Sequence, residues 1–366
     1  MRSKFRGNRS DEDRTELAVL GVGNIGSVHV RSALAMPTVD VIAAADVDPE
    51  NRAWAEEAGV PETYEDVETL FASTEPDVAV VALPPFLHLE AVEQAAAAGV
   101  DVFVEKPLAR SVEEVDSLLE TASDGGIAVG VDHTLRYQPD IAAVKAAYDD
   151  GSLGHVPFAT MTRLNDGALG RPPIEQPPPG WQLDPEASGG GALFELGVHC
   201  FDVLEWILGP LSVRDVHLDG TVAAPAADAT TVVLRSNERE TTVVCHAGTY
   251  QWEHLPAVNT RLRLEGIADT ATNTEHVPDN FYVAAARSAL SNVLARVRGR
   301  PPTVFGPTHY LRAHYLALED FIEARRMGED PPVDGADGRR AVSLVEAALE
   351  RAERHPTTPP TPGVTS

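Results

Sequence analysis

The stretch LAVLGVGNIGSVHVRSAL, residues 17–34, decides the fold of this chain. A short apolar run turns through three glycines, spaced G-x-G-x-x-G, into a helix-forming segment. In this pattern the first glycine permits a tight turn, the second lets a pyrophosphate approach the backbone, and the third lets helix and strand pack closely. The N–H groups that open the helix would face the phosphates. These residues are predicted to bind a dinucleotide: Gly21, Gly23, Asn24, Ile25 and Gly26.

A carboxylate follows the next apolar run, VDVIAAAD, residues 39–46. Asp46 would end a second strand, where an acid can accept hydrogen bonds from the ribose hydroxyls of NAD and would repel the 2′-phosphate of NADP. Arg52 lies six residues on and leaves NADP open as an alternative cofactor. Asp46 could instead cap the following helix, but Asp48, directly before Pro49, suits that role better.

Strand-like and helix-like segments then alternate up to residue 132. The runs DVAVVALP (77–84), VDVFVE (100–105) and IAVGVD (127–132) are apolar and β-branched, and helical patterns separate them. This alternation predicts an α/β domain with a doubly wound parallel sheet. Ligands bind such sheets at the carboxyl ends of the strands. The segment Glu105–Lys106–Pro107 follows one of these strands directly.

The length of 366 residues suits two domains. We expect a first domain at 17–132 and a second at 133–353, with a disordered leader at 1–16 and a disordered Pro/Thr tail at 354–366. No apolar run approaches the ~20 residues that span a bilayer, and the leader has no apolar core of a secretory signal. A cytoplasmic protein is therefore predicted.

The charge balance limits the partners. The chain carries 56 Asp and Glu against 29 Lys and Arg, a net charge of −27, which repels nucleic acid and membranes. Lysine occurs only as Lys4, Lys106 and Lys145, a pattern that resembles halophilic proteins of salt-rich cytoplasm. A lysine retained against this bias indicates a role for Lys106. Cys200 and Cys245 are interpreted as isolated thiols.

The ordered motifs along the chain resemble the glucose–fructose oxidoreductase/inositol dehydrogenase (Gfo/Idh/MocA) family from about residue 17 to 353. The resemblance implies a Rossmann domain followed by an α+β domain with an open, mostly antiparallel sheet, whose face commonly packs between subunits of a homo-oligomer, here a dimer or tetramer. The matching motifs are the glycine turn, Asp46, LPPFLH with Pro84 and His88, AGVDVFVEKPLA, VDHTLRYQP, GGGALFELGVHCFDVLEWILG and DGRRAVSLVEAALERA.

The resemblance also implies the catalytic residues. A helix after the glycines would bring Glu195 and His199 to the nicotinamide, and residues four apart share a helix face. His199 would act as general base on a substrate hydroxyl, while Lys106 would hold that hydroxyl and stabilise alkoxide charge. The family usually has Asp where this chain has Glu195, so the carboxylate reaches about one methylene further.

Other site residues are implied more loosely. Thr134 stands where the family often has Asn, and the loop at 171–191 is either a lid or an acidic surface excursion. No metal is expected at His199, Cys200 and Asp202, because NAD chemistry needs none and adjacent residues on a helix point apart. The further cofactor-binding residues are Asp46, Pro84, His88, Glu105 and Lys106. The candidate substrate contacts are Arg136, Tyr137, Arg163, Asn165, Trp181 and Asp202.

These observations predict an NAD(P)-dependent oxidoreductase that transfers a hydride between the nicotinamide and a secondary alcohol of a sugar, polyol or inositol-like substrate. Two alternatives stay open. One is a non-catalytic NAD(P)-binding regulator of the same fold, which loss of the lysine or histidine would favour. The other is a glycosidase that uses bound NAD for a transient oxidation.

Overall fold

The computed structural model describes residues 14–165, 191–219, 229–249, 258–273 and 309–354. They divide into two compact units. Unit 1 lies within residues 1–146 and 273–342, and unit 2 within residues 147–272 and 343–366. Unit 1 therefore includes a late segment that falls inside the second domain predicted from the sequence, 133–353. Most of the predicted leader and tail lies outside the described residues.

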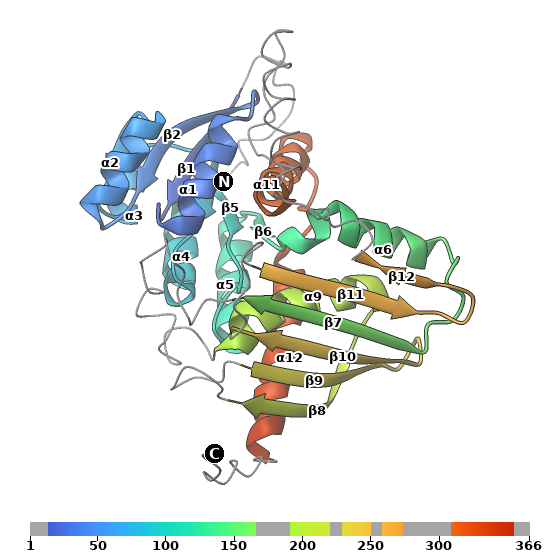
Figure 1. Cartoon of the computed structure of the whole chain (residues 1–366). Helices are drawn as coiled ribbons and strands as arrows, with labels where there is room; N and C mark the ends of the chain where they lie inside the picture. The colour runs from blue at the N-terminus through green and yellow to red at the C-terminus, as the bar shows by residue number, and fades with distance from the viewer. Residues whose placement is uncertain (1–13, 166–190, 220–228, 250–257, 274–308, 355–366) are drawn as a thin grey trace, which may run out of the picture. The chain divides into compact units, whose positions relative to one another are not determined.

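Unit 1 contains a six-stranded sheet, called sheet A, in which every neighbouring pair is parallel (Figure 1). Its strand order, β3-β2-β1-β4-β5-β6, reverses direction between β1 and β4, which is the Rossmann arrangement. The predicted doubly wound sheet is thus confirmed. The strands are β1 (Thr15–Leu20), β2 (Val39–Ala45), β3 (Glu62–Tyr64), β4 (Val78–Val81), β5 (Asp101–Val104) and β6 (Val129–Val131).

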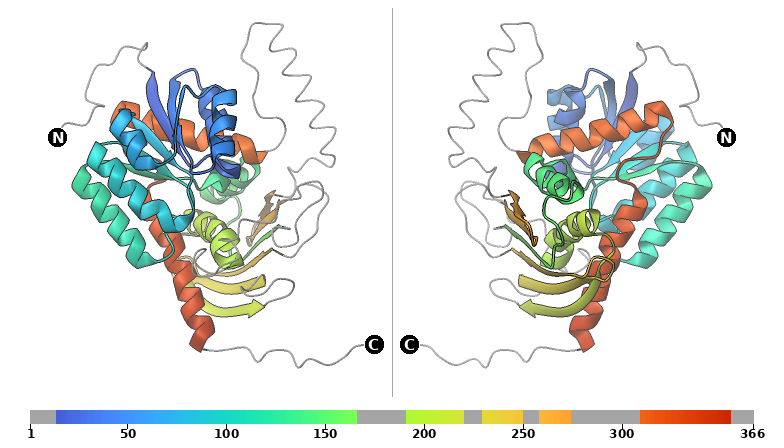
Figure 2. Two further views of the ribbon diagram at one scale, coloured as in Figure 1. Left: turned by 90° about the vertical axis from the view of Figure 1, so that its left-hand side faces the viewer. Right: turned by 90° about the vertical axis from the view of Figure 1, so that its right-hand side faces the viewer.

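Helices connect these strands, and three of them begin at polar caps. The side chains of Asp48, Asp66 and Ser111 accept backbone N–H groups at three helix starts, as such residues do at N-caps. Asp48 and not Asp46 caps its helix, as predicted. Helices α4 and α5 pack side by side (Figure 2). The helices are α1 (Asn24–Leu34), α2 (Pro49–Ala58), α3 (Val67–Ser73), α4 (His88–Ala98), α5 (Val112–Gly125), α6 (Pro139–Asp149) and α11 (His309–Met327), with short 3-10 turns at Pro85–Leu87 and Thr134–Tyr137.

The core of unit 1 joins both of its chain segments. Leu17, Val80 and Phe103 of the sheet lie in one buried cluster with Leu318 and Phe321 of α11. The ring of Phe321 packs over β6, where a Cβ added to Gly130 would lie 2.4 Å from it. Helix α11 is therefore part of the nucleotide-binding unit, although it comes almost 180 residues after β6 in the chain.

Unit 2 contains a second six-stranded sheet, called sheet B, in the order β12-β11-β7-β10-β9-β8. Only the pair β7 and β10 is parallel, and the other pairs are antiparallel, which confirms the predicted open sheet (Figure 1). Buried and half-buried residues alternate along β9 and β10, because one face packs on α9. The strands are β7 (Phe158–Asn165), β8 (Ser212–Asp219), β9 (Ala229–Ser236), β10 (Thr241–Gly248), β11 (Val258–Glu265) and β12 (Thr270–Thr272).

The helix predicted after the glycines begins with a π-helical segment, Leu193–Gly197, and continues as α9, Val198–Leu208. The last helix, α12, covers Gly335–Arg354 and belongs to unit 1 up to residue 342. Among the described residues, no helix is long and apolar enough to cross a membrane.

Candidate active site

The glycine turn of unit 1 has the geometry that a dinucleotide needs. Gly21 has φ +86°, and a Cβ there would lie 2.5 Å from the carbonyl oxygen of Ala82. A Cβ on Gly26 would lie only 1.9 Å from the oxygen of Gly21, so helix and strand meet backbone to backbone. Gly23 is exposed and has nothing within 4 Å of an added Cβ. The glycine turn is therefore tightly packed at Gly21 and Gly26 and open at Gly23.

The first turn of α1 is suited to an anion. Gly23 caps the helix, Asn24 is exposed, Ile25 is half-buried, and the turn has no acidic side chain. The positive end of the helix dipole and the unpaired N–H groups thus face the open side of the loop. An NAD pyrophosphate fits this cradle, because only a residue without a Cβ keeps the approach at Gly23 clear.

Asp46 ties the end of β2 to the glycine loop. Its Oδ2 accepts the backbone N–H of Val22 at 2.7 Å and the amide of Asn51 at 3.1 Å, and its Oδ1 accepts the N–H of Asp48 at 2.8 Å. The carboxylate has further lone pairs for a ribose hydroxyl. Arg52 donates to the backbone carbonyls of Asp46 and Val47, so its guanidinium lies beside this carboxylate.

His88 connects two loops at the carboxyl edge of sheet A. Its ring is fully buried, with Nε2 2.8 Å from the carbonyl oxygen of Leu83 and Nδ1 3.1 Å from that of Leu108. Burial lowers the pKa of His88, although these carbonyl contacts act to raise it. His88 therefore joins the loop after β4, where Pro84 is half-buried, to the loop after β5. Its predicted contact with the cofactor stays a prediction.

Glu105 and Lys106 follow β5 at the same edge. The N–H of Glu105 donates to the carbonyl of Val81, and the N–H of Lys106 donates to Oε2 of Glu105 at 3.2 Å. Glu105 is 5% exposed, while Lys106 is half-buried and is joined to Pro107 by a cis peptide bond. The carboxylate thus points into unit 1, beneath the lysine that carries the predicted chemistry.

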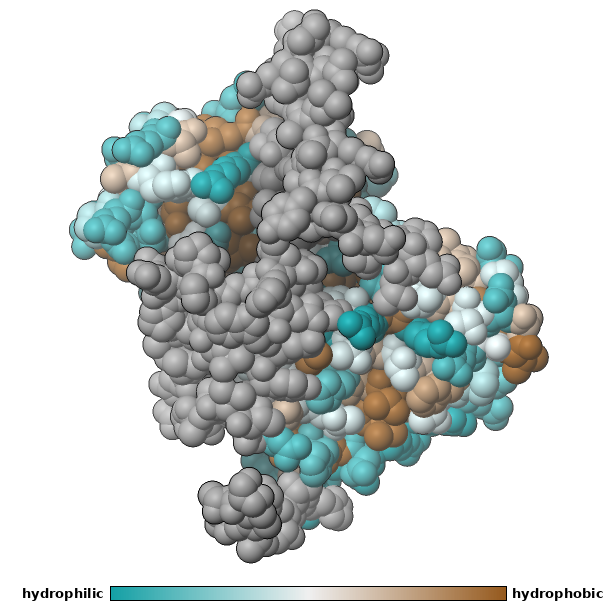
Figure 3. Space-filling model, in the orientation of Figure 1, coloured by the Kyte–Doolittle hydropathy of each residue, from teal (hydrophilic) through white to brown (hydrophobic). Residues whose placement is uncertain are grey.

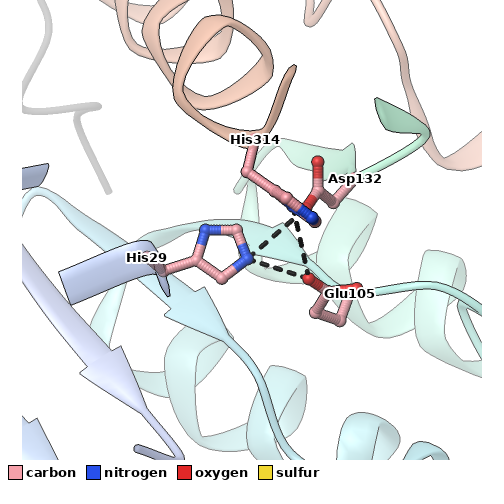
Figure 4. Close-up of side chains that lie close together, drawn as sticks. All are labelled: His29, Glu105, Asp132 and His314. Carbon is pink, nitrogen blue, oxygen red and sulfur yellow. Dashed lines mark hydrogen bonds and ion pairs between the residues drawn. The ribbon is translucent and has the colours of Figure 1, made fainter. Parts of the chain in front are cut away.

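A buried group of two histidines and two carboxylates surrounds Glu105 (Figure 4). We call His29, Glu105, Asp132 and His314 the His–carboxylate cluster. His29 Nε2 lies 2.9 Å from Glu105 Oε1 and 3.4 Å from Asp132 Oδ2, and His314 Nδ1 lies 2.5 Å from Asp132 Oδ2 and 3.9 Å from Glu105 Oε1. The side chains are between 0% and 7% exposed, so water does not solvate these charges.

Electrostatics within the cluster are strong. Burial lowers the pKa of His29, but hydrogen bonds and charge from Asp132 and Glu105 outweigh it and raise the pKa to about 9. Burial acts to raise the pKa of Asp132, but the two histidines hold it well below its ordinary range. Sequence reasoning found only Glu105 here. His29 lies within the glycine-containing stretch at residues 17–34, but no sequence motif relates it to Asp132 or to His314 on α11.

In unit 2, the π-helical segment places the predicted catalytic pair. Glu195 lies within it and is half-buried, while His199, in the first turn of α9, is 5% exposed. Asp202, three residues on, is 2% exposed. The wider i→i+5 winding changes where Glu195 points relative to His199, and π-segments are frequent at functional sites. The sequence prediction assumed α-helical spacing between Glu195 and His199 and therefore did not include this π-helical segment.

The looser substrate predictions have mixed placements. Arg136 donates to Asp337 at 2.8 Å, and Tyr137 packs against the core of unit 1, where burial and Asp320 raise its pKa. Arg163 is 3% exposed and donates to Thr260. Asn165 is the last residue of β7, and the structure describes only its backbone. Trp181 lies outside the described residues.

Family models match both parts of the chain. Residues 15–133 match the model described as "Oxidoreductase family, NAD-binding Rossmann fold", and residues 141–270 match the C-terminal domain of the Gfo/Idh/MocA type. The two matches follow each other in the order that the sequence motifs predict.

Curated relatives align over nearly the whole chain. Inositol 2-dehydrogenase of Rhizobium meliloti is 26% identical over 344 residues, covering 90% of this chain and 94% of the relative. Myo-inositol 2-dehydrogenase of Thermotoga maritima is 26% identical over 348 residues, covering 92% and 96%. Among solved structures, the WlbA dehydrogenase from Bordetella pertussis in complex with NADH and UDP-GlcNAcA has a TM-score of 0.76 at 20% identity, covering 94% and 97%, which shows a shared fold.

Proposed function

Because the chain belongs to the Gfo/Idh/MocA family of oxidoreductases with an NAD-binding Rossmann fold, we propose that it transfers a hydride between NAD and a secondary alcohol of a sugar, polyol or inositol. The chain is an oxidoreductase and NAD is its cofactor. The proposed substrate class is that of relatives named for inositol, and a polar substrate suits a site of lysine, histidine and carboxylate.

The observation that carries this proposal is the carboxyl edge of sheet A. The glycine turn after β1 and the Glu105–Lys106 segment after β5 lie at the edge where Rossmann sheets hold the dinucleotide. We propose that Lys106 hydrogen-bonds the substrate hydroxyl and stabilises the negative charge that develops on its oxygen. Bound NAD⁺ would accept the hydride from the carbon that bears this hydroxyl.

His199 is the proposed general base. It would take the hydroxyl proton as the hydride leaves, so that oxidation of the alcohol releases one proton to the imidazole and two electrons with one proton to the nicotinamide. An imidazole suits this exchange near neutral pH. We propose that Glu195 binds a neighbouring substrate hydroxyl, and that Asp202, on the same helix as His199, helps to orient the base.

The experiment measures NADH formation with a panel of inositols, sugars and polyols at high salt. Lys106→Ala and His199→Ala are each expected to lower kcat/KM by about 10²- to 10⁴-fold, because each removes a group that acts at the reacting hydroxyl. Matched controls are Lys145→Ala on α6 and His217→Ala on β8, which should stay close to wild type. NADH binding, followed by its fluorescence, should persist in all four variants.

Two outcomes would contradict the proposal. Turnover that neither Lys106→Ala nor His199→Ala reduces would remove the catalytic assignment. NAD binding without turnover on any member of the panel would favour the non-catalytic regulator instead.

We also propose a cytoplasmic homo-oligomer that works at high salt. The face of sheet B opposite α9 carries half-buried apolar side chains, Val233 and Val244 among them. Figure 3, which is coloured by hydropathy, shows apolar residues in brown among polar ones. Covering such a face in a second subunit would bury apolar area. The net charge of −27 opposes association unless salt screens it. Sedimentation velocity at low and high salt should show assembly increasing with salt, and a monomer under both conditions would contradict the proposal.

A further inference from the structure

We propose that the His–carboxylate cluster of unit 1 binds one divalent transition-metal ion, Zn²⁺, through His29 Nε2, Glu105 Oε1, Asp132 Oδ2 and His314 Nδ1. Each of the four residues offers one ligand atom, and these atoms all lie within 4.8 Å of one another. Nothing in the sequence predicts the site, because its ligands come from α1, from the ends of β5 and β6, and from α11. The proposal is independent of the hydride-transfer reaction.

The distances fit a tetrahedral ion. Zinc bound to nitrogen and oxygen at 2.0–2.2 Å requires ligand atoms about 3.3 Å apart along each edge of the tetrahedron. The four nitrogen–oxygen distances in the cluster are 2.5, 2.9, 3.4 and 3.9 Å, which lie on both sides of that value. To reach that value, the 2.5 Å distance must lengthen by about 0.8 Å and the 3.9 Å distance must shorten by about 0.6 Å.

The ring arrangement gives a second, separate fit. Two imidazoles on one tetrahedral ion should have their centroids about 5.2 Å apart, given a metal–nitrogen bond near 2.05 Å. The centroids of His29 and His314 are 5.4 Å apart, and their planes meet at 86°. In Figure 4, a nitrogen of each ring faces the carboxylates of Glu105 and Asp132.

Charge compensation is compatible with an ion. Two carboxylates buried this deeply require two positive charges nearby. A divalent cation with two neutral imidazoles supplies them at the centre of the cluster. The alternative is two imidazolium rings, which would compensate the carboxylates without an ion, and metal analysis distinguishes the two cases.

The ligand set selects the metal. Two imidazoles disfavour Mg²⁺ and Ca²⁺, which prefer oxygen, and a four-coordinate nitrogen–oxygen site without thiolates suits Zn²⁺. All four protein ligands would be used, so the ion would be structural and not catalytic. It would fix α1 and α11 against the ends of β5 and β6 and so hold the backbone of Glu105, on which Lys106 depends.

The test is metal analysis of the full chain, produced without a polyhistidine tag and dialysed against buffer with trace zinc and without chelator. We expect about one zinc per chain by mass spectrometry of the elements. Replacement by Co²⁺ should give the strong visible absorption of a tetrahedral site. A chelator should lower Tm, and added zinc should restore it, because the ion binds only the folded state.

Variants locate the ion. Asp132→Asn and His314→Gln keep side-chain size and are each expected to weaken zinc affinity by roughly 100-fold or more. The matched control is Asp77→Asn, in the same unit, whose carboxylate accepts the N–H of Glu16 and should retain full zinc. If either cluster variant does not fold, the number of zinc ions per wild-type chain and the spectrum of the cobalt-substituted protein still show whether a tetrahedral site is present.

Two results would overturn the proposal. One is wild-type protein that holds far less than one zinc per chain, with a Tm unaffected by zinc or chelator. The other is zinc bound equally well by Asp132→Asn or His314→Gln, which would place the ion elsewhere.

Discussion

The two sheets of this molecule use the same number of strands for different purposes. Sheet A is parallel, and β1, β4, β5 and β6 are buried on both faces almost without exception. Sheet B is mixed, and its central strands alternate between a buried and a half-buried face. In sheet A, polar side chains occur just beyond the strand ends, as Asp46, Glu105 and Asp132 do. In sheet B they share the strands with apolar residues.

The difference between the two sheets indicates at which positions each unit tolerates substitutions. At Gly26 and in the His–carboxylate cluster, beyond the ends of sheet A, backbone, carboxylate and imidazole groups are closely packed and buried, so a single added atom or lost charge has no room to be compensated. The open face of sheet B has space and solvent, unless another molecule covers it. Substitutions that are chemically identical should therefore have unequal effects in the two sheets.

The largest effect is expected for Gly26→Ala, at the crowded end of sheet A. The new Cβ would lie 1.9 Å from the carbonyl oxygen of Gly21, and backbone must move to relieve the clash. We expect the free energy of unfolding to fall by about 3 kcal/mol or more. Urea denaturation followed by circular dichroism measures it.

The control is Gly99→Ala, at the end of α4, where φ is +70° and nothing lies within 4 Å of an added Cβ. Only backbone strain opposes this change, so about 1 kcal/mol is expected. Equal losses for both variants would show that crowding at the turn is not what fixes Gly26.

The next effect compares one substitution in both sheets. Val80→Ala in β4 removes two methyl groups from a fully buried site and should cost about 2 kcal/mol. Val244→Ala in β10 removes them from the half-buried face and should cost less than about 1 kcal/mol. Denaturation by urea in low and high salt measures both. A cost at Val244 that rises to that of Val80 at high salt would indicate that a second subunit covers the face.

The smallest effect concerns Asp337→Asn, at an ion pair that joins the two chain segments of unit 1. Burial acts to raise the pKa of Asp337, but hydrogen bonding and charge from Arg136 lower it below its ordinary value. The contribution to stability is therefore present above the unfolded pKa, about 3.9, and is lost as the pH falls below it. Near pH 7 we expect the variant to lose less than about 1 kcal/mol.

The measurement is urea denaturation of both proteins from pH 7 into the acid range, where the two curves should approach each other as the pH falls through the lowered pKa of the folded Asp337 carboxyl. Asp116→Asn, at the exposed pair with Arg339, is the matched control and should change less. A difference between wild type and Asp337→Asn that stays constant with pH would contradict the ion-pair explanation.

Much of the fold could be predicted from the sequence, because its signals are local. The glycines, the β-branched runs and the caps act over a few residues, and they placed the longer strands of sheet A closely. The strands β3 and β12 were missed, since three residues carry little periodicity. The helix α3 was also missed, because seven residues are only about two helical turns. The π-helical turn at Leu193–Gly197 was missed because an α-helical pattern of apolar residues continues through it.

The candidate site likewise contains some residues that have local sequence signals and others that have none. Gly21 and Gly26 have local roles, and the structure gives them the tight turn and the close packing that the motif predicts. Asp46 follows β2 directly, and its contact with the ribose stays a prediction. The His–carboxylate cluster has no local signal, because His29 and His314 are almost 300 residues apart and only the packing of α11 brings them together. Arg136 likewise has a partner far along the chain, Asp337 on α12, which reasoning from one motif could not find.

The position of α11 in the chain has a consequence for synthesis. A ribosome that has released β6 has made all of sheet A but has not yet made Leu318, Phe321 and Ile322, which complete its core. At about 5–20 residues per second, the nascent nucleotide-binding unit waits roughly 10 to 40 s for them, with its core incomplete. The unit that is translated first therefore completes its core only after residues 147–272 of unit 2 have been made.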